Sequence, residues 1–297
     1  MTDAHTAQSG RAVHALLWVA AVAVMLPVSA YGQAGEDLRG AIELVDPKVL
    51  RVCADPHNLP FSDDQGAGFE NKIAELLAEK LGKGLAYTWY PQAPGFVRNT
   101  LAAHRCDLIM GLPQGDDLAQ GTNPYYRTAY AIAYKAGRGL DGVNSLEDPR
   151  LKDRRIGIVA GTPPATYLAI NGLMAQAKPY HLVVDTRVES SAEMMMKDLA
   201  ASEIDAGVLW GPLAGFYARG ANPPVRVVPL INETTGPRLV YRITMAVRAS
   251  DQHWKRLLNQ LIKENQPAIE KILLSYDVPL LDERNQPITE ESRAGQR

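Results

Sequence analysis

A strand, a loop and a helix follow one another in residues 49–82, and this unit restricts the fold that the rest of the chain can adopt. The apolar run Val49–Ala54 is typical of a buried strand, and it stops just before Pro56 because proline cannot continue a central strand. Over Phe69–Leu81 apolar residues recur at helical spacing with charges between them, which predicts an amphipathic helix. In open α/β sheets ligands bind outside the carboxyl ends of the strands, so the polar loop between strand and helix is the first candidate site.

The same alternation of strands and helices continues along the chain and predicts an α/β protein. Strands are expected at residues 85–90 and 107–111 with a helix at 96–103 between them, and this β-α-β-α-β order implies parallel strands. A second set of strands and helices covers residues 155–229, and residues 236–247 then return to the first set. We therefore expect lobe I at residues 31–134 and 238–283, lobe II at residues 135–237, and a flexible C-terminal tail at residues 284–297.

Two of the predicted elements can be specified further. Residues 181–185 are expected to form one of the strands of lobe II. Residues 251–275 predict a long amphipathic helix that packs on lobe I. An interruption or kink is expected near Pro267, because proline lacks the N–H group of a helical hydrogen bond.

The N-terminus has the features of an export signal. A charged segment with Arg11 precedes an uncharged stretch, residues 15–27, which is followed by small residues up to Ala30. The stretch is shorter than the roughly 20 apolar residues of a membrane-spanning helix. We therefore expect residues 1–30 to be a signal peptide, cleaved after Ala30 or Ala34, and the mature protein to be exported without stable membrane insertion.

The composition suits a folded protein and argues against one class of partner. The 297 residues are 46% hydrophobic and 22% charged, which is typical of a soluble globular protein of one or two domains. The formal net charge is −2 and no basic run is present, so we expect no nucleic-acid binding.

The two cysteines, Cys53 and Cys106, are a candidate disulfide in an oxidising compartment. Each lies beside a predicted strand, and the two strands should be parallel neighbours. Cys53 is near the end of its strand and Cys106 at the start of the other, so register argues against the Cα separation of less than about 7 Å that a disulfide needs. The sequence leaves the pairing open. No second Cys or His stands at ligand spacing to either cysteine, which argues against a metal site.

Motifs of the common catalytic classes are missing from the sequence. It contains no G-x-S-x-G, no H-E-x-x-H and no Walker A motif. The acidic pairs Asp63-Asp64 and Asp116-Asp117 lie in polar loops without the ligand spacing of a calcium site, and His57 is a lone histidine in the first loop. We therefore expect a protein that is not an enzyme and that holds neither a metal nor a cofactor.

Several segments resemble one group of bacterial proteins. The run LRVCADPHNLPFS, with GFENKIAELLAEKLG after it, resembles the opening of periplasmic solute-binding proteins of the amino-acid-binding type. Together with WYPQAPGFVRNTL, CDLIMGLP and NPYYRTAYA, it resembles more closely the methanol oxidation J proteins, which are solute-binding-like accessory proteins encoded with PQQ-dependent methanol dehydrogenases. The resemblance covers about residues 49–281. It implies a two-lobed, type II, amino-acid-binding-like periplasmic binding protein fold, in which each lobe is an open sheet flanked by helices and the ligand cleft lies between the lobes.

The groups that hold an amino acid in such relatives are missing here. Relatives usually have an Arg in the loop after the third strand, which pairs with the ligand carboxylate, and an acid after a later strand, which receives the ammonium. Residues 111–117 contain no Arg, and Trp210 stands in place of the acid. A helix start at Gly161-Thr162 persists, and a helix N-terminus can bind an anion. The expected cleft, for a ligand or a partner, comprises Asp55, Asn58, Phe61, Phe96, Arg98, Pro113, Tyr125, Tyr126, Gly161, Thr162 and Trp210.

The resemblance implies a periplasmic accessory protein that binds a PQQ-dependent methanol dehydrogenase, of the calcium or lanthanide type, and assists its assembly or activation. The cytochrome c of that dehydrogenase is a further candidate partner, and the class implies a monomer. The alternative is the solute-binding component of an ABC transporter for a small ligand other than an amino acid. A third hypothesis, an enzyme, rests on Glu70, because some relatives of this fold are lyases with a catalytic Glu in the cleft.

Overall fold

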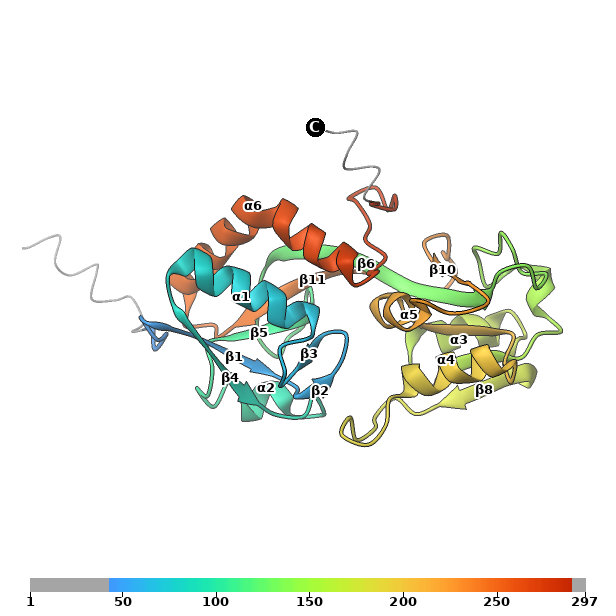
Figure 1. Ribbon diagram of the computed structural model, residues 1–297, viewed down its shortest axis with the longest axis horizontal. Coiled ribbons are helices and arrows are strands. Elements are labelled where there is room, and N and C mark those ends of the chain that lie inside the picture. The colour runs from blue at the N-terminus through green and yellow to red at the C-terminus, as the bar shows by residue number, and fades with distance from the viewer. Residues whose placement is uncertain (1–42, 290–297) are drawn as a thin grey trace, which may run out of the picture. The chain divides into compact units, whose positions relative to one another are not determined.

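The computed structural model describes residues 43–289, which form a mixed sheet with helices packed on it (Figure 1). The predicted signal peptide, residues 1–30, lies outside the described residues, as does the end of the predicted tail, residues 290–297. Within the described part, no helix is both long enough and apolar enough to cross a membrane.

A single sheet runs through the described chain in the order β4-β1-β5-β11-β6-β9-β7-β8, and β10 pairs with β6. Strand β1 pairs in parallel with β4 and β5, as the β-α-β-α-β order predicts. Strand β11 is antiparallel to β5 and β6, and β2 and β3 form a separate hairpin in the loop after β1. The strands are β1 (Val49–Ala54), β2 (His57–Asn58), β3 (Ser62–Asp63), β4 (Gly84–Trp89), β5 (Leu108–Pro113), β6 (Gln120–Lys135), β7 (Ile156–Val159), β8 (Ala177–Tyr180), β9 (Ala206–Trp210), β10 (Val225–Pro229) and β11 (Val240–Val247).

The long strand β6 takes part in two portions of the sheet. Its residues 120–129 pair with β11, and its residues 130–134 pair with β9. We call β4, β1, β5, β11 and residues 120–129 of β6 the proximal half, and β9, β7, β8, β10 and residues 130–135 of β6 the distal half. The predicted limits of lobes I and II stay a prediction, and the strand pairing describes the two halves of the sheet only.

Alternation along the proximal strands builds a separate core on each face of the sheet, because successive side chains point to opposite faces. Val52, Leu108 and Met245 belong to the core that contains residues of α1 and α6. Their neighbours Cys53 and Ile109 belong to the core that contains residues of α2. In Figure 1, α1 and α6 accordingly lie on one side of these strands and α2 on the other. These helices are α1 (Phe69–Leu81), α2 (Phe96–Asn99) and α6 (Gln252–Ser275).

The distal half likewise has two apolar clusters. One gathers Ile156 with Tyr167 and Leu168, and the other gathers Met195 with Leu209. The helices that contribute are α3 (Pro163–Ile170), α4 (Ser191–Ala201) and α5 (Gly211–Ala218), and two short 3₁₀ segments are η2 (Pro149–Leu151) and η3 (Met174–Gln176).

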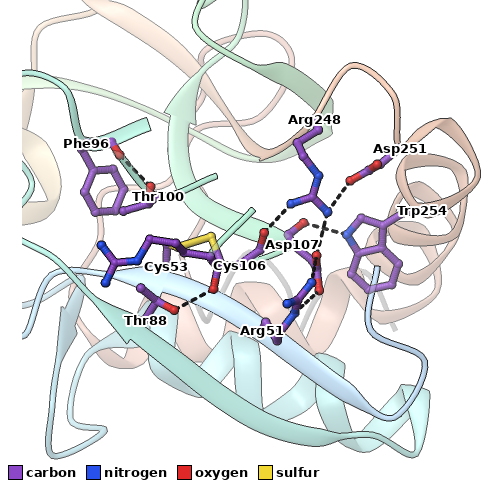
Figure 2. The surroundings of a disulfide bond; sticks show 11 residues. Arg51, Cys53, Thr88, Phe96, Thr100, Cys106, Asp107, Arg248, Asp251 and Trp254 are labelled. Atoms are coloured by element: carbon purple, nitrogen blue, oxygen red, sulfur yellow. Dashed lines mark hydrogen bonds and ion pairs between the residues drawn. A yellow bond between two sulfur atoms is a disulfide. The ribbon is translucent and has the colours of Figure 1, made fainter. Parts of the chain in front are cut away.

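Cys53 and Cys106 form a disulfide, and their Cα atoms are 5.6 Å apart (Figure 2). The register argument against this bond was wrong, because Cys106 is not part of the parallel ladder. Strand β5 begins only at Leu108, which pairs with Val52. The segment before β5 is held instead by Thr88, whose Oγ1 donates to the carbonyl of Arg105 at 2.8 Å.

A buried ion-pair network lies beside the disulfide (Figure 2). The Asp107 carboxylate accepts hydrogen bonds at 2.7 Å from Arg51 and from Arg248. Its carbonyl accepts a hydrogen bond at 2.9 Å from the indole N–H of Trp254 on α6. Burial alone would raise the pKa of Asp107, but the hydrogen bonds from Arg51 and Arg248 lower it overall. Asp107 therefore joins β1, the segment before β5 and the start of α6.

The predicted strand at residues 181–185 is not formed. Strand β8 lies earlier in the chain and pairs with β7 up to Val159 and Tyr180, where β7 itself ends. Because the next residues have no neighbouring strand to pair with, residues 181–189 form an irregular segment.

In the C-terminal part of the chain the predicted helix is not interrupted at Pro267, and a kink there stays a prediction. Helix α6 continues through Pro267, which is exposed, so the carbonyl that loses its helical partner can be solvated. In the described part of the predicted tail, the N–H of Ile288 donates to the carbonyl of Leu280 at 2.9 Å and its side chain packs on the proximal core. The flexibility of the tail stays a prediction.

Candidate functional site

Two neighbouring cavities lie where the proximal and distal halves approach each other. The first, of about 420 Å³, is named the aromatic cavity. Its walls are formed by Phe61, Glu70, Gln92, Gly111, Pro113, Tyr126, Tyr130, Pro163, Trp210, Tyr241 and Ile243. The second, of about 870 Å³, is named the loop cavity, and residues from 57–65, 92–94 and 181–193 supply most of its wall. Gln92, Tyr130 and Trp210 line both cavities, so the two spaces adjoin each other.

Aromatic rings from three strands meet in the wall of the aromatic cavity. Trp210 at the end of β9 packs edge-on against Tyr130 of β6, with ring centroids 5.1 Å apart, and against Tyr241 of β11 at 5.7 Å. Tyr130 and Tyr241 are 6.2 Å apart. The planes of each pair differ by 67° to 76°, so the ring faces point in different directions.

Glu70 is the charged side chain in the wall of the aromatic cavity, among the residues that the structure describes. It lies in the first turn of α1 and is 9% exposed. Burial raises its pKa to about 8, because a carboxylate loses hydration in this apolar surrounding. Gly111 of β5 makes room for this carboxyl group, since a Cβ atom there would stand 2.3 Å from Glu70 Oε1.

The segment 181–189 forms one wall of the loop cavity and carries unusually exposed apolar side chains. Leu182, Val183 and Val188 are 58%, 62% and 81% exposed. Thr186 in the same segment donates from Oγ1 to Asp55 at 3.3 Å. Three such side chains on one short segment make it a candidate interaction surface.

Asp55, which follows β1, organises the cavity wall from a buried position. It is 2% exposed, and its carboxylate accepts the N–H groups of His57 at 2.8 Å and Gln92 at 2.7 Å in addition to the Thr186 hydroxyl. With these partners its oxygens are occupied inside the protein. Asp55 therefore holds two loops and the 181–189 segment together.

Most of the predicted cleft residues lie in or behind these walls. Phe61, Pro113, Tyr126 and Trp210 line the aromatic cavity, and Asn58, Thr162 and again Trp210 line the loop cavity. Their role in binding stays a prediction. The other five predicted residues line neither cavity. Asp55 is buried behind the wall of the loop cavity, and Gly161 precedes Thr162 at the start of α3. Phe96 packs in the core around the disulfide, Arg98 is exposed on α2 outside both cavities, and Tyr125 is fully buried behind Tyr126.

The helix start at Gly161-Thr162 is poorly equipped for an anion. Thr162 uses its hydroxyl to donate to the carbonyl of Val159 at 2.6 Å. Pro163 and Pro164 follow, and neither has a backbone N–H group. The first turn of α3 therefore lacks donors that most helix N-termini present.

The sequence reasoning missed Gln92, Tyr130 and Tyr241 and considered Glu70 only for an enzyme. Strand alternation could have identified Tyr130. It lies four residues after the predicted Tyr126 in β6, so both side chains share one face of the strand. Tyr241 alternates with Ile243 in the same way in β11, and both line the aromatic cavity.

Across the described residues, no group of three or more His, Cys, Asp or Glu side chains could hold a metal ion. Two of the acids in the polar loops accept hydrogen bonds from backbone groups of the same loops. Asp63 accepts one from the N–H of Ala67 at 2.6 Å, and Asp116 accepts one from the N–H of Leu118 at 2.8 Å.

Comparisons with known proteins place the chain among binding proteins. A family model for bacterial extracellular solute-binding proteins matches residues 108–272. The chain is 30% identical over 254 residues to Protein MoxJ of Methylorubrum extorquens, an alignment that covers 81% of this chain and 84% of that protein.

Two solved structures resemble this one over most of its length. The periplasmic binding protein XoxJ from Methylobacterium extorquens AM1 is 43% identical with a TM-score of 0.68, and the match covers 79% of this chain and all (100%) of XoxJ. MxaJ from Methlophaga aminisulfidivorans MPT is 26% identical with a TM-score of 0.67, and the match covers 78% of this chain and 100% of MxaJ. The predicted periplasmic binding protein fold and the predicted group of relatives are thereby confirmed.

Proposed function

Because the chain belongs to the bacterial extracellular solute-binding proteins, and within them to the group that includes Protein MoxJ, we propose that it is a periplasmic accessory protein of methanol oxidation. It binds a PQQ-dependent methanol dehydrogenase, of the calcium or lanthanide type, and assists its assembly or activation. It does so as a monomer without catalytic activity of its own. The cytochrome c that accepts electrons from that dehydrogenase is a second candidate partner.

The observation that carries this proposal is the loss of the groups that hold an amino acid. Among the described residues, the wall of the aromatic cavity contains no Arg or Lys that could pair with a ligand carboxylate. Strand β9 is followed by Gly211 and Pro212, so no acid stands there to receive an ammonium. A binding-protein scaffold without these anchors fits a role other than amino-acid uptake.

The exposed apolar segment 181–189 supports docking to a protein. Apolar groups at the centre of an interface supply most of its binding energy, and solvent-exposed clusters of them are uncommon on isolated proteins. Leu182, Val183 and Val188 lie on one irregular segment that Asp55 holds in place through Thr186. We propose this segment as the main contact with the dehydrogenase.

The test is a direct binding measurement between the mature protein and the purified methanol dehydrogenase of its host, in both the cofactor-free and the loaded form. We expect Val188→Asp to weaken the complex by about tenfold or more, a change of about 1.4 kcal/mol. The matched control is Leu118→Asp, because Leu118 is also an exposed apolar residue, at 71% against 81% for Val188, and lies on a different loop. Absence of binding to both forms of the enzyme would contradict the accessory role. Equal effects of the two substitutions would contradict the docking surface alone.

A second function, the solute-binding component of an ABC transporter for a small ligand other than an amino acid, is favoured by one observation. The aromatic cavity of about 420 Å³ persists and contains a buried carboxyl group, that of Glu70. A stoichiometric small molecule released from the purified protein, together with no affinity for any methanol dehydrogenase, would support transport in place of the accessory role.

A further inference from the structure

We propose that the aromatic cavity binds a small organic monocation, an alkylammonium or quaternary ammonium ion, with the Glu70 carboxylate as its counter-ion and the surrounding rings as cation–π partners. This site is separate from the proposed docking segment at residues 181–189. The proposal does not depend on the accessory role, because it concerns the purified protein and a small molecule.

The first support is the state of Glu70. Its side chain is buried and lines the cavity, yet no hydrogen bond or ion pair to its carboxyl group is formed by any residue in the described part of the chain. Ionising a buried carboxyl group without a partner is costly, so the group stays protonated unless a cation or several donors are present. A bound cation would supply the missing partner at this place.

The second support is the set of rings around the cavity. Trp210, Tyr130 and Tyr241 form the edge-on cluster described above, and Phe61 and Tyr126 line the cavity from the proximal half. Ring faces attract cations through their quadrupole, and this attraction is strongest for Trp and increases when water is excluded. Several rings with differently directed faces and one carboxylate form a chemical setting suited to an ammonium group.

The third support is a cation that already rests on one of these rings. The guanidinium carbon of Arg238 lies 4.5 Å from the ring centroid of Tyr241. Arg238 is exposed, so this contact forms at the rim of the site. The Tyr241 ring thus already accepts a positive charge on the face that meets Arg238.

The charges in the cavity wall favour a ligand with a single positive charge. Among the described residues the wall has no basic side chain, and α3 begins with two prolines without N–H groups, so an anion or a carboxylate finds few donors. Glu70 is the single acid in that described wall, which matches one positive charge. A zwitterionic amino acid would bring a carboxylate that nothing there balances.

The test compares two probes of the same shape and different charge, choline and its neutral isostere 3,3-dimethylbutan-1-ol. Binding to the purified mature protein is measured by titration calorimetry and by the fluorescence of the tryptophans, of which Trp210 lines the site. We expect saturable choline binding at least about tenfold tighter than binding of the isostere, which corresponds to about 1.4 kcal/mol. Equal affinities, or no saturable choline binding, would overturn the proposal.

A pair of variants tests the counter-ion. Glu70→Gln keeps the shape of the side chain and removes its charge, and we expect it to lower choline affinity by about tenfold or more while leaving the weak binding of the isostere unchanged. Glu75→Gln on the exposed side of the same helix should change neither. Circular dichroism melting confirms that both variants are folded. If folded Glu70→Gln bound choline as well as the wild-type protein, the assignment of the counter-ion would be wrong.

Discussion

The Glu70 carboxyl group lies against the backbone of Gly111, so closely that a Cβ atom on Gly111 would stand 2.3 Å from Oε1. Gly111 also has a φ of 77°, a conformation that side-chain-bearing residues rarely adopt. Two separate constraints therefore require glycine at this position, and one of them exists only because Glu70 points into the cavity. This contact joins β5, in the cavity wall, to the first turn of α1.

We expect Gly111→Ala to destabilise the protein and to displace the Glu70 side chain. The matched control is Gly115→Ala, because Gly115 has a φ of 89° but no described atom within 4 Å of the added Cβ. The control should cost about 1–2 kcal/mol through backbone strain alone. Gly111→Ala should cost a further 1–3 kcal/mol or so from the overlap, measured by urea unfolding. Equal losses in the two variants would contradict the close contact.

The stability of the ligand-free protein should fall as pH rises from about 4.5 toward 8 through the titration of Glu70. The ordinary pKa of 4.5 is raised to about 8 in the folded protein by burial. The folded state then holds a proton that the unfolded state has released, so the contribution is complete below pH 4.5 and is lost as pH rises through 8. The slope cannot exceed about 1.4 kcal/mol per pH unit from this one group. Urea unfolding of the wild-type protein and of Glu70→Gln at several pH values measures this slope. If the free energy of unfolding changed with pH in the same way in both proteins, the raised pKa of Glu70 would be contradicted.

Choline should bind more tightly as pH rises toward 8 and then level off, because the cation binds the ionised form of Glu70. Below that pH the affinity should rise by up to about tenfold per pH unit, with release of one proton. The electrostatic neighbours of Glu70 are Tyr87 on β4 and Tyr125 and Tyr126 on β6, and burial raises the pKa of each, so these groups stay neutral in this range. Calorimetry in two buffers of different ionisation enthalpy detects the proton. An affinity that does not change between pH 6 and pH 8, roughly the range of the titration, would contradict the prediction.

Asp107→Asn removes a buried charge and should lower the stability of the folded protein strongly. Asp107 is 1% exposed at its side chain and pairs with Arg248, which is 7% exposed. Removing the Asp107 charge leaves the buried Arg248 with Asp251 alone and takes the acidic partner from Arg51, so we expect a loss of about 3 kcal/mol, at the lower end of the range for breaking a buried pair. Glu283→Gln is the control, because Glu283 is 75% exposed in its pair with Arg242 and should cost about 1 kcal/mol or less. Urea unfolding compares them, and similar losses would show that burial of the Asp107 pair is not decisive.

Joint replacement of Cys53 and Cys106 by Ala should lower stability without changing the cavities. The bond links residues 53 positions apart, and closing a loop of that kind typically stabilises the folded state by about 2–5 kcal/mol. Neither cysteine lines the aromatic cavity, so choline affinity should stay at the wild-type value while the unfolding midpoint falls. A loss of choline binding in a variant that is still folded would show that the bond shapes the site.

Local chemistry explains which parts of the fold could be predicted from the sequence. Strand β1 was predicted from its short apolar run and helix α1 from apolar residues at helical spacing, and both signals lie in consecutive residues. The family was recognisable because segments such as NPYYRTAYA resemble those of its members. A strand was expected at residues 181–185, but the strand forms at residues 177–180, because those residues lie beside β7. Which residues lie beside another strand depends on the tertiary fold and not on the local sequence.

The sequence by itself determined the alternating strand–helix order and the family, because both depend on residue type and order. Tertiary structure alone decided that Cys106 leaves the ladder to reach Cys53, and that rings from β6, β9 and β11 meet in one wall. It also decided that Glu70 faces this cavity without a described partner. Such features arise from contacts between residues far apart in the chain, and their energies depend on burial, which no local pattern of residues specifies.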